Sequence, residues 1–127
     1  QAAGGLKTEA AKIVSGGPMM GFALYDLNVP CVKTTSAFLC MEHDPVSEAT
    51  VTACINCGRC VKVCPGRVLP SRLATLAERG DMEGFEKMNG MECCECGCCS
   101  YVCPAKRPLT QSIKSMRKMV LASRRKK

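Results

Sequence analysis

Aromatic side chains are scarce in this chain of 127 residues, which has no tryptophan, two tyrosines and three phenylalanines. Little large apolar surface is therefore available for a core, and we expect a metal or a covalent cross-link to help stabilise the fold. The sequence also lacks a signal peptide and any apolar run approaching about 18 residues. It therefore offers no segment that would cross a membrane by itself.

Acidic residues are absent from residues 105–127, which hold nine lysines and arginines, whereas residues 1–104 hold nine basic and eleven acidic residues. Such a basic end is either simply solvated or a docking strip for an acidic protein surface, an anionic membrane or nucleic acid. The scarcity of aromatic residues argues against stacking on bases. The nine basic residues are Lys106, Arg107, Lys114, Arg117, Lys118, Arg124, Arg125, Lys126 and Lys127.

Cysteine, in contrast, is abundant, with 12 residues in the chain. Because no export signal is visible, these thiols are better interpreted as metal ligands than as disulfides. The chain begins with Gln1 rather than methionine, and we expect it to be a piece of a longer protein.

Eight of the cysteines form two copies of the pattern C-x2-C-x2-C-x3-C-P. We call residues 54–65 the first cysteine run and residues 93–104 the second. Two-residue gaps let three thiolates converge on one [4Fe-4S] cube, and the fourth cysteine of such a run serves the other cluster in two-cluster ferredoxins. The predicted ligand sets are therefore Cys54, Cys57 and Cys60 with Cys103, and Cys93, Cys96 and Cys99 with Cys64.

Two other interpretations of the runs are weaker. Structural zinc normally uses two pairs of ligands separated by a longer loop and would leave cysteines unused here. Disulfides would need an oxidising compartment and would be strained between such close partners. Gly58 and Gly97 follow the second cysteine of each run, where we expect the missing Cβ to let the chain pass close to the inorganic core.

The remaining cysteines and the single histidine receive no ligand role. Small buried apolar positions are the expected environment of such cysteines, which are Cys31, Cys40, Cys94 and Cys98. His43 lies in a polar stretch, and a lone histidine in a loop is usually just solvated. The sequence also has no nucleophile–base pair and no G-x-G-x-x-G loop, so it offers no substrate site.

The predicted fold class is α+β, with a small β-rich fragment over residues 1–41, a polar linker over 42–53 and a helical domain over 54–127. Strands are expected at 12–15, 21–25, 29–33 and 37–41, with a glycine-rich turn at 16–21. A helix is predicted from Pro70 to Gly80, with Leu69, Leu73 and Leu76 on one face. A second is expected between Asp81 and Gly90. A third starts at Pro108, with an apolar stripe of Leu109, Ile113, Met116 and Val120.

The segments KIVSGGPMMG, VPCVKTT, CINCGRCVKVCP and GFEKMNGMECCECGCCSYVCPAKRPLTQSI together resemble the C-subunit family of the Rnf complexes, ion-translocating NAD:ferredoxin oxidoreductases of bacterial membranes. The likeness extends from about Ala2 to Ile113. It implies the end of a β-grasp domain of the soluble-ligand-binding type, then an α-helical ferredoxin domain with two [4Fe-4S] clusters. The family's cluster ligands carry over to all eight cysteines of the runs.

The resemblance further implies an electron relay on the cytoplasmic face of the membrane, as a peripheral part of an oxidoreductase and translocase complex. FMN and NADH would bind only to an upstream domain that is absent here, and the basic last helix would dock on partner subunits. Two alternatives remain open: a cobalamin-reductase-type iron–sulfur subunit, and a structural iron–sulfur domain whose basic tail binds nucleic acid, although we expect no nucleic-acid partner.

Overall fold

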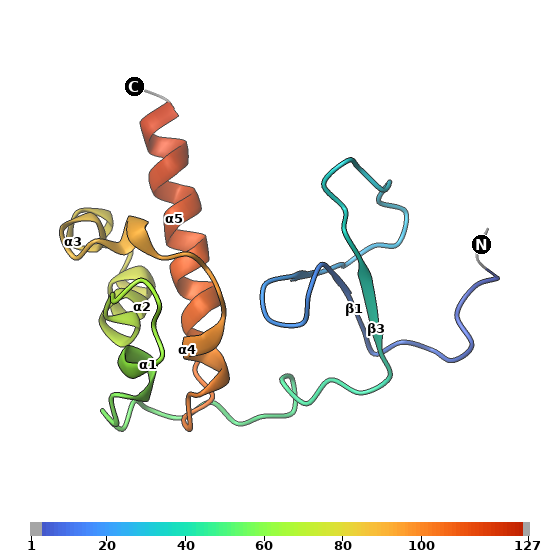
Figure 1. Cartoon of the computed structure of the whole chain (residues 1–127), viewed down its shortest axis with the longest axis horizontal. Coiled ribbons are helices and arrows are strands. Elements are labelled where there is room, and N and C mark those ends of the chain that lie inside the picture. The colour runs from blue at the N-terminus through green and yellow to red at the C-terminus, as the bar shows by residue number, and fades with distance from the viewer. Residues whose placement is uncertain (1–3, 126–127) are drawn as a thin grey trace. The chain divides into compact units, whose positions relative to one another are not determined.

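The computed structural model describes residues 4–125. The chain divides into two compact units, residues 1–49 and residues 50–127. Figure 1 shows strands in the first unit and helices in the second.

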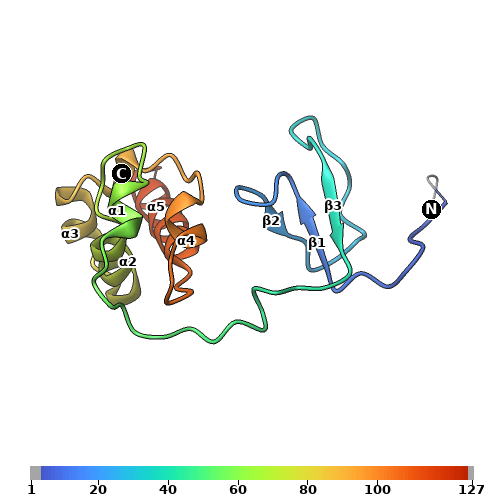
Figure 2. The ribbon, with the colours of Figure 1, turned by 60° about the horizontal axis from the view of Figure 1, so that its bottom comes forward.

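The first unit holds a three-stranded antiparallel sheet in the order β2-β1-β3. Its strands are β1 (Lys12–Ser15), β2 (Phe22–Ala23) and β3 (Phe38–Met41), and β1 lies between the other two in Figure 2. Val14 of the central strand faces Ala23 on one side and Leu39 on the other. The strands predicted near 12–15, 21–25 and 37–41 are therefore present, although the second is shorter than expected.

The strand predicted at 29–33 is wrong, because these residues form a loop and turn. Pro30 has no N–H to donate to a sheet. The backbone N–H of Val32 instead donates to Oγ1 of Thr35, at 3.1 Å. Local bonds of this kind compete with strand pairing, and here they hold the segment in a turn.

The second unit contains five α-helices and one 3-10 turn among its described residues. They are α1 (Arg59–Lys62), α2 (Pro70–Arg79), α3 (Met82–Lys87), η1 (Gly90–Glu92), α4 (Cys98–Tyr101) and α5 (Leu109–Arg125). The helix ends follow the predicted signals. Pro70 starts α2 and Gly80 ends it in the left-handed conformation. The carboxylate of Asp81 caps α3 by accepting a bond from the N–H of Gly84, at 2.8 Å.

The core of this unit lies where α2 and α5 run side by side (Figure 1). All four residues of the apolar stripe predicted on the last helix are buried. Ile113, Met116 and Val120 pack with the fully buried Leu73 and Phe85, whereas Leu109 packs in a smaller cluster with Ala74 and Cys99. Burial of one such side chain contributes about 1.5–3 kcal/mol. The prediction that Leu69 lies on the buried face is wrong. Leu69 is the N-cap of α2 and is 43% exposed, and Val68 enters the core instead.

No helix between residues 4 and 125 combines the length and the apolar character needed to span a bilayer.

Candidate iron–sulfur centres

The two cysteine runs share their short helix and their left-handed positions. In each run a left-handed residue follows the first cysteine by two positions, a left-handed glycine caps a four-residue helix, and a third left-handed residue follows the last cysteine by three positions. The matched pairs are Asn56 and Glu95, Gly58 and Gly97, and Arg67 and Lys106. The runs are therefore structural as well as sequence repeats.

The glycines of the runs are required by their backbone angles. Gly58 has φ 71° and Gly97 has φ 83°, a region that side chains with a Cβ rarely adopt. A Cβ on Gly58 would meet no protein atom within 4 Å. The positive φ is the observed reason for glycine there, and the close approach to an inorganic core stays a prediction.

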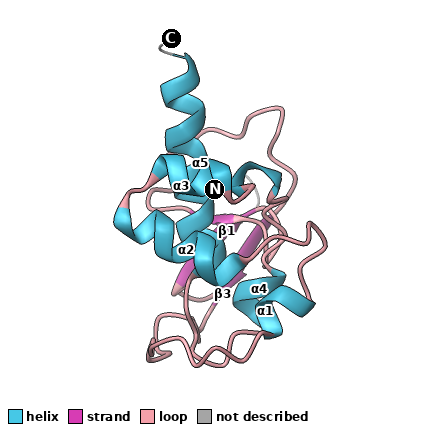
Figure 3. Ribbon diagram, turned by 90° about the vertical axis from the view of Figure 1, so that its left-hand side faces the viewer, coloured by secondary structure: helices cyan, strands magenta, loops and turns pink. Residues whose placement is uncertain are grey.

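The helices of the two runs, α1 and α4, lie in contact, as Figure 3 shows. The entry to the first run is also tied to the exit of the second, because the N–H of Thr52 donates to the carbonyl oxygen of Ala105 at 3.0 Å. This pairing brings the last cysteine of each run toward the other run.

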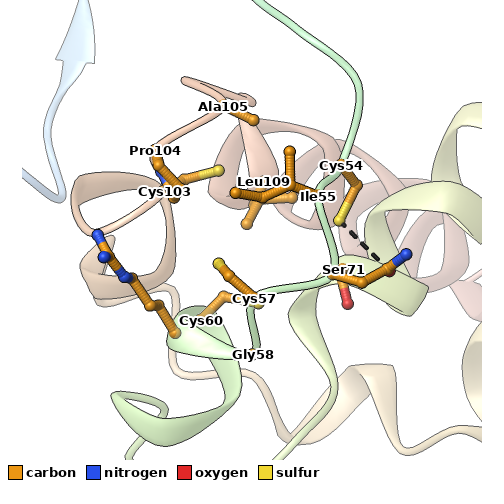
Figure 4. A pocket seen from close by; sticks show the side chains of 12 residues that line it. Cys54, Ile55, Cys57, Gly58, Cys60, Ser71, Cys103, Pro104, Ala105 and Leu109 are labelled. Carbon is orange, nitrogen blue, oxygen red and sulfur yellow. Dashed lines mark hydrogen bonds between the residues drawn. The ribbon is translucent and has the colours of Figure 1, made fainter.

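The first cavity, of about 100 Å³, is lined by three thiols of the first run and one of the second: Cys54, Cys57, Cys60 and Cys103. In Figure 4 the sulfurs of Cys57 and Cys103 point into the same hollow. Ala105 and Leu109 supply apolar lining. Cys60 and Cys103 also pack against one small buried cluster that contains Leu109.

The second cavity has the complementary composition. It is lined by Cys64 of the first run and by Cys93, Cys96 and Cys99 of the second, together with Cys94, which lies outside the repeated pattern. Val68, Pro70 and Ile113 supply apolar lining. Cys64 and Cys93 both pack against the core around Phe85. Each cavity thus has four thiols of the repeated C-x2-C-x2-C-x3-C pattern. Four thiols are the donor set that a [4Fe-4S] cluster takes, and the residues fit that group.

The thiols of each set surround a hollow. Among residues 4–125, no three His, Cys, Asp or Glu side chains converge on one point as they would around a single metal ion.

Burial raises the pKa of the Cys93 and Cys99 thiols above the ordinary value. Both thiols therefore hold their protons at neutral pH when nothing is bound. Because iron binds the thiolate, cluster assembly has to displace these protons.

Sequence reasoning missed a set of hydroxyl groups that holds the second run to the start of α5. The N–H of Thr110 donates to Oγ of Ser100 at 2.9 Å, and the two hydroxyls lie 2.8 Å apart. The Thr110 hydroxyl also lies 3.3 Å from the sulfur of Cys99. These residues have no periodicity or spacing in the sequence that would single them out.

The cysteines outside the ligand sets do not have the expected environment. Cys31, Cys40 and Cys94 are exposed and Cys98 is half-buried, so the prediction of small buried positions is wrong for the first three. Cys94 also lies at the second cavity. His43 is exposed, and its Nδ1 lies 3.1 Å from a carboxylate oxygen of Glu48.

Much of the predicted basic docking strip is used inside the second unit. Arg107 donates to Glu78 at 2.8 Å, and Arg124 donates to Glu86 at 2.5 Å. Lys114 and Arg117 both pair with Glu95. Lys106, Lys118 and Arg125 are exposed, whereas Lys126 and Lys127 lie outside the described residues. The strip is therefore not a continuous free surface.

Comparison with known families agrees with the chemistry of the two cavities. Residues 53–106 match the family model of the 4Fe-4S dicluster domain. The second unit accordingly contains a 4Fe-4S dicluster domain, whose family implies two [4Fe-4S] clusters.

Curated relatives show to which protein family the chain is similar. The chain is 43% identical over 123 residues (97% of the chain, 28% of the relative) to the C subunit of the Na(+)-translocating ferredoxin:NAD(+) oxidoreductase complex of Acetobacterium woodii. It is 44% identical over 115 residues (90% and 25%) to the proton-translocating counterpart of Clostridium ljungdahlii. It is 39% identical over 114 residues (90% and 26%) to the C subunit of the ion-translocating oxidoreductase complex of Methanosarcina acetivorans. The chain belongs to this C-subunit family, and it spans about a quarter of the length of these relatives.

Proposed function

We propose that this chain relays electrons through two [4Fe-4S] clusters within a membrane-associated, ion-translocating ferredoxin:NAD oxidoreductase complex. The observation that carries the proposal is that each cavity is lined by the first three pattern cysteines of one run and by the last pattern cysteine of the other. Two clusters held this way would each take ligands from both cysteine runs. The relatives favour this function over that of a cobalamin-reductase-type subunit.

We assign one cluster to Cys54, Cys57, Cys60 and Cys103, and the other to Cys93, Cys96, Cys99 and Cys64. When bound, such a cluster accepts and gives one electron at a time. The chain supplies the four thiolates, fixes their positions through the short helices α1 and α4, and limits water with Leu109 at one site and Ile113 at the other. No substrate has to be bound for this task.

The wider context is also part of the proposal. The relatives are named as subunits of complexes, so the partners would be other subunits and an upstream domain of the full-length protein that binds FMN and NADH. The complex would hold the chain peripherally at the cytoplasmic face of the membrane. We take residues 1–41 as the end of a β-grasp domain, 42–53 as a linker and 54–127 as the ferredoxin domain.

The function is tested with anaerobically prepared chain. We expect about eight irons and eight sulfides per chain, and a broad absorbance near 400 nm that dithionite bleaches and a mild oxidant restores. Iron that is present but does not respond to dithionite would make the clusters structural. In the assembled complex, replacing Cys57 with alanine should abolish NAD reduction by reduced ferredoxin while the other subunits stay assembled.

A further inference from the structure

Positive and negative charges are separated along the second unit. All six of its acidic residues lie between Glu78 and Glu95. Within residues 4–125, four of them form ion pairs, one of which joins Glu83 to Lys87. The other three pair with basic residues of the C-terminal part: Glu78 with Arg107, Glu86 with Arg124, and Glu95 with Lys114 and Arg117. The acidic segment therefore neutralises much of the basic end.

The first cysteine run has basic residues that this segment does not neutralise. Residues 49–77 contain no aspartate or glutamate. Arg59 lines the first cavity, Lys62 belongs to the same short helix, and Lys106 directly follows the cavity residue Ala105. All three are exposed and make no ion pair within the described part of the chain.

The first run is also more exposed than its repeat. Cys54 and Cys57 are exposed, whereas the matching Cys93 and Cys96 are half-buried. The helix α1 has no buried residue, but α4 buries Cys99. Ile55, beside these thiols, is 65% exposed. The two cavities are therefore unequal, and the first is the one nearer to the solvent.

We propose that the surface formed by Ile55, Arg59, Lys62 and Lys106 docks the acidic surface of an electron-transfer protein, so that electrons enter or leave through the first cavity. We call this surface the first-run face, and the inference rests on the proposed relay function. Its unneutralised cations attract and orient a negatively charged partner over long range. The exposed apolar side chain of Ile55 then excludes water next to the thiols at contact.

The charge of a bound cluster does not reverse this argument. With four thiolates, a [4Fe-4S] cluster carries about −2 when oxidised and about −3 when reduced. The three cations of the face exceed the first charge and balance the second. An anionic membrane fits less well, because lipid-binding segments gather about four to eight basic residues, on an amphipathic helix or next to a membrane span. The first-run face has three basic residues and only the four-residue helix α1.

The test uses two haem proteins of opposite surface charge, acidic cytochrome b5 and basic cytochrome c, as acceptors for the reduced, cluster-loaded chain. One electron passes to the ferric haem, which becomes ferrous, and no bond forms or breaks. At low salt we expect cytochrome b5 to be reduced at least about tenfold faster than in 0.5 M NaCl, because screening removes the attraction. Cytochrome c should show no such decrease with salt.

Charge-reversal variants test which basic residues attract cytochrome b5. K62E/K106E should lower the low-salt rate with cytochrome b5 at least about tenfold, whereas K118E/R125E, with the same charge change at exposed residues of α5, should change it less than about twofold. Calorimetry of oxidised cytochrome b5 with the oxidised chain should show binding that K62E/K106E abolishes and K118E/R125E retains. Iron content and the rate with duroquinone, a neutral acceptor, are measured for every variant.

Each outcome separates the docking proposal from the relay. If both double variants lowered the rate with cytochrome b5 equally, or if that rate did not respond to salt, docking at the first-run face would be refuted. The reaction with duroquinone would still support the relay. Failure to reduce duroquinone would overturn the relay itself. Sedimentation with vesicles of 30% phosphatidylserine that depends on Lys62 and Lys106, without any effect on cytochrome b5, would replace the protein partner with a membrane.

Discussion

The guanidinium group of Arg117 on α5 contacts the carboxylate of Glu95 in the second cysteine run. A second nitrogen of Arg117 donates to the carbonyl oxygen of Met91 at 3.2 Å, and Lys114 lies 3.8 Å from the other carboxylate oxygen of Glu95. Glu95 itself lies at the second cavity, where its N–H donates to the sulfur of Cys93 at 3.4 Å. The last helix therefore places charges next to one cavity and holds its cysteine loop in place.

The Arg117–Glu95 pair predicts opposite shifts of one cluster potential. R117M removes a cation and should lower one of the two midpoint potentials by tens of millivolts, because the reduced cluster loses a favourable charge. E95Q removes an anion and should raise the same potential by a similar amount. The potentials are measured by redox titration followed by electron paramagnetic resonance.

The opposite signs distinguish an electrostatic effect from loosening of the loop. If the variants only disturbed the structure, both potentials would move in the same direction or the cluster would be lost. R125M, at the exposed end of α5, is the matched control and should leave both midpoints unchanged.

The exchange of fourth ligands predicts which double variants keep a cluster. Cys64 and Cys93 line the same cavity, so C64A/C93A should damage one site and retain about four irons per chain. Cys54 and Cys64 line different cavities, so C54A/C64A should damage both sites. Anaerobic iron analysis measures the difference, and the reverse result would mean that each run binds its own cluster with all four of its cysteines.

The Lys12–Asp44 contact predicts a pH effect in the first unit. The hydrogen bond from Lys12, at 2.7 Å, lowers the pKa of the Asp44 carboxyl below its ordinary value. Since the folded pKa is the lower one, this contact stabilises the fold above the ordinary aspartate pKa of about 3.9. That stabilisation is lost as the pH falls through the folded pKa.

Replacing Lys12 with methionine should raise the pKa of Asp44 toward that of a free aspartate. The measurement is an NMR titration of the side-chain carboxyl carbon. K33M changes an exposed lysine of the same unit and should leave the Asp44 titration as it is. An unchanged pKa in K12M would show that Lys12 does not hold the carboxylate in its charged form.

The contact between Gly90 and Phe85 predicts a steric conflict that can be relieved. A Cβ on Gly90 would come within 2.4 Å of the Phe85 ring, which is fully buried. G90A should therefore destabilise the second unit by about 1–3 kcal/mol, as overpacking does. In the F85L background, with a smaller side chain at position 85, the same substitution should cost less. Denaturation of the cluster-loaded chain, followed by circular dichroism, measures all four proteins, and equal losses in both backgrounds would contradict the contact.

Local signals in the sequence predicted most of the helix ends and the buried face of the last helix. Pro70, Gly80 and Asp81 mark helix ends because their backbone preferences act on their own turn. The stripe from Leu109 to Val120 follows from helical periodicity. The strand expected at 29–33 is absent for a local reason as well, since the N–H of Val32 donates to the hydroxyl oxygen of Thr35 instead of to a neighbouring strand. The prediction that Leu69 is buried is wrong because an N-cap residue does not have helical backbone angles, so its side chain does not follow the periodicity of the helix.

The sequence by itself determined the eight thiols of the two runs, their identical loops and the chemistry of their donor set, because spacing and residue type act over a few positions. Only the tertiary structure decided that the first run is the exposed one, that Arg117 and Thr110 brace the second, and that Glu78 and Glu86 neutralise part of the basic end. These features depend on contacts between residues 10 to 38 positions apart in the chain. No local pattern records such contacts, since they form only when α2, α3 and α5 pack around one core.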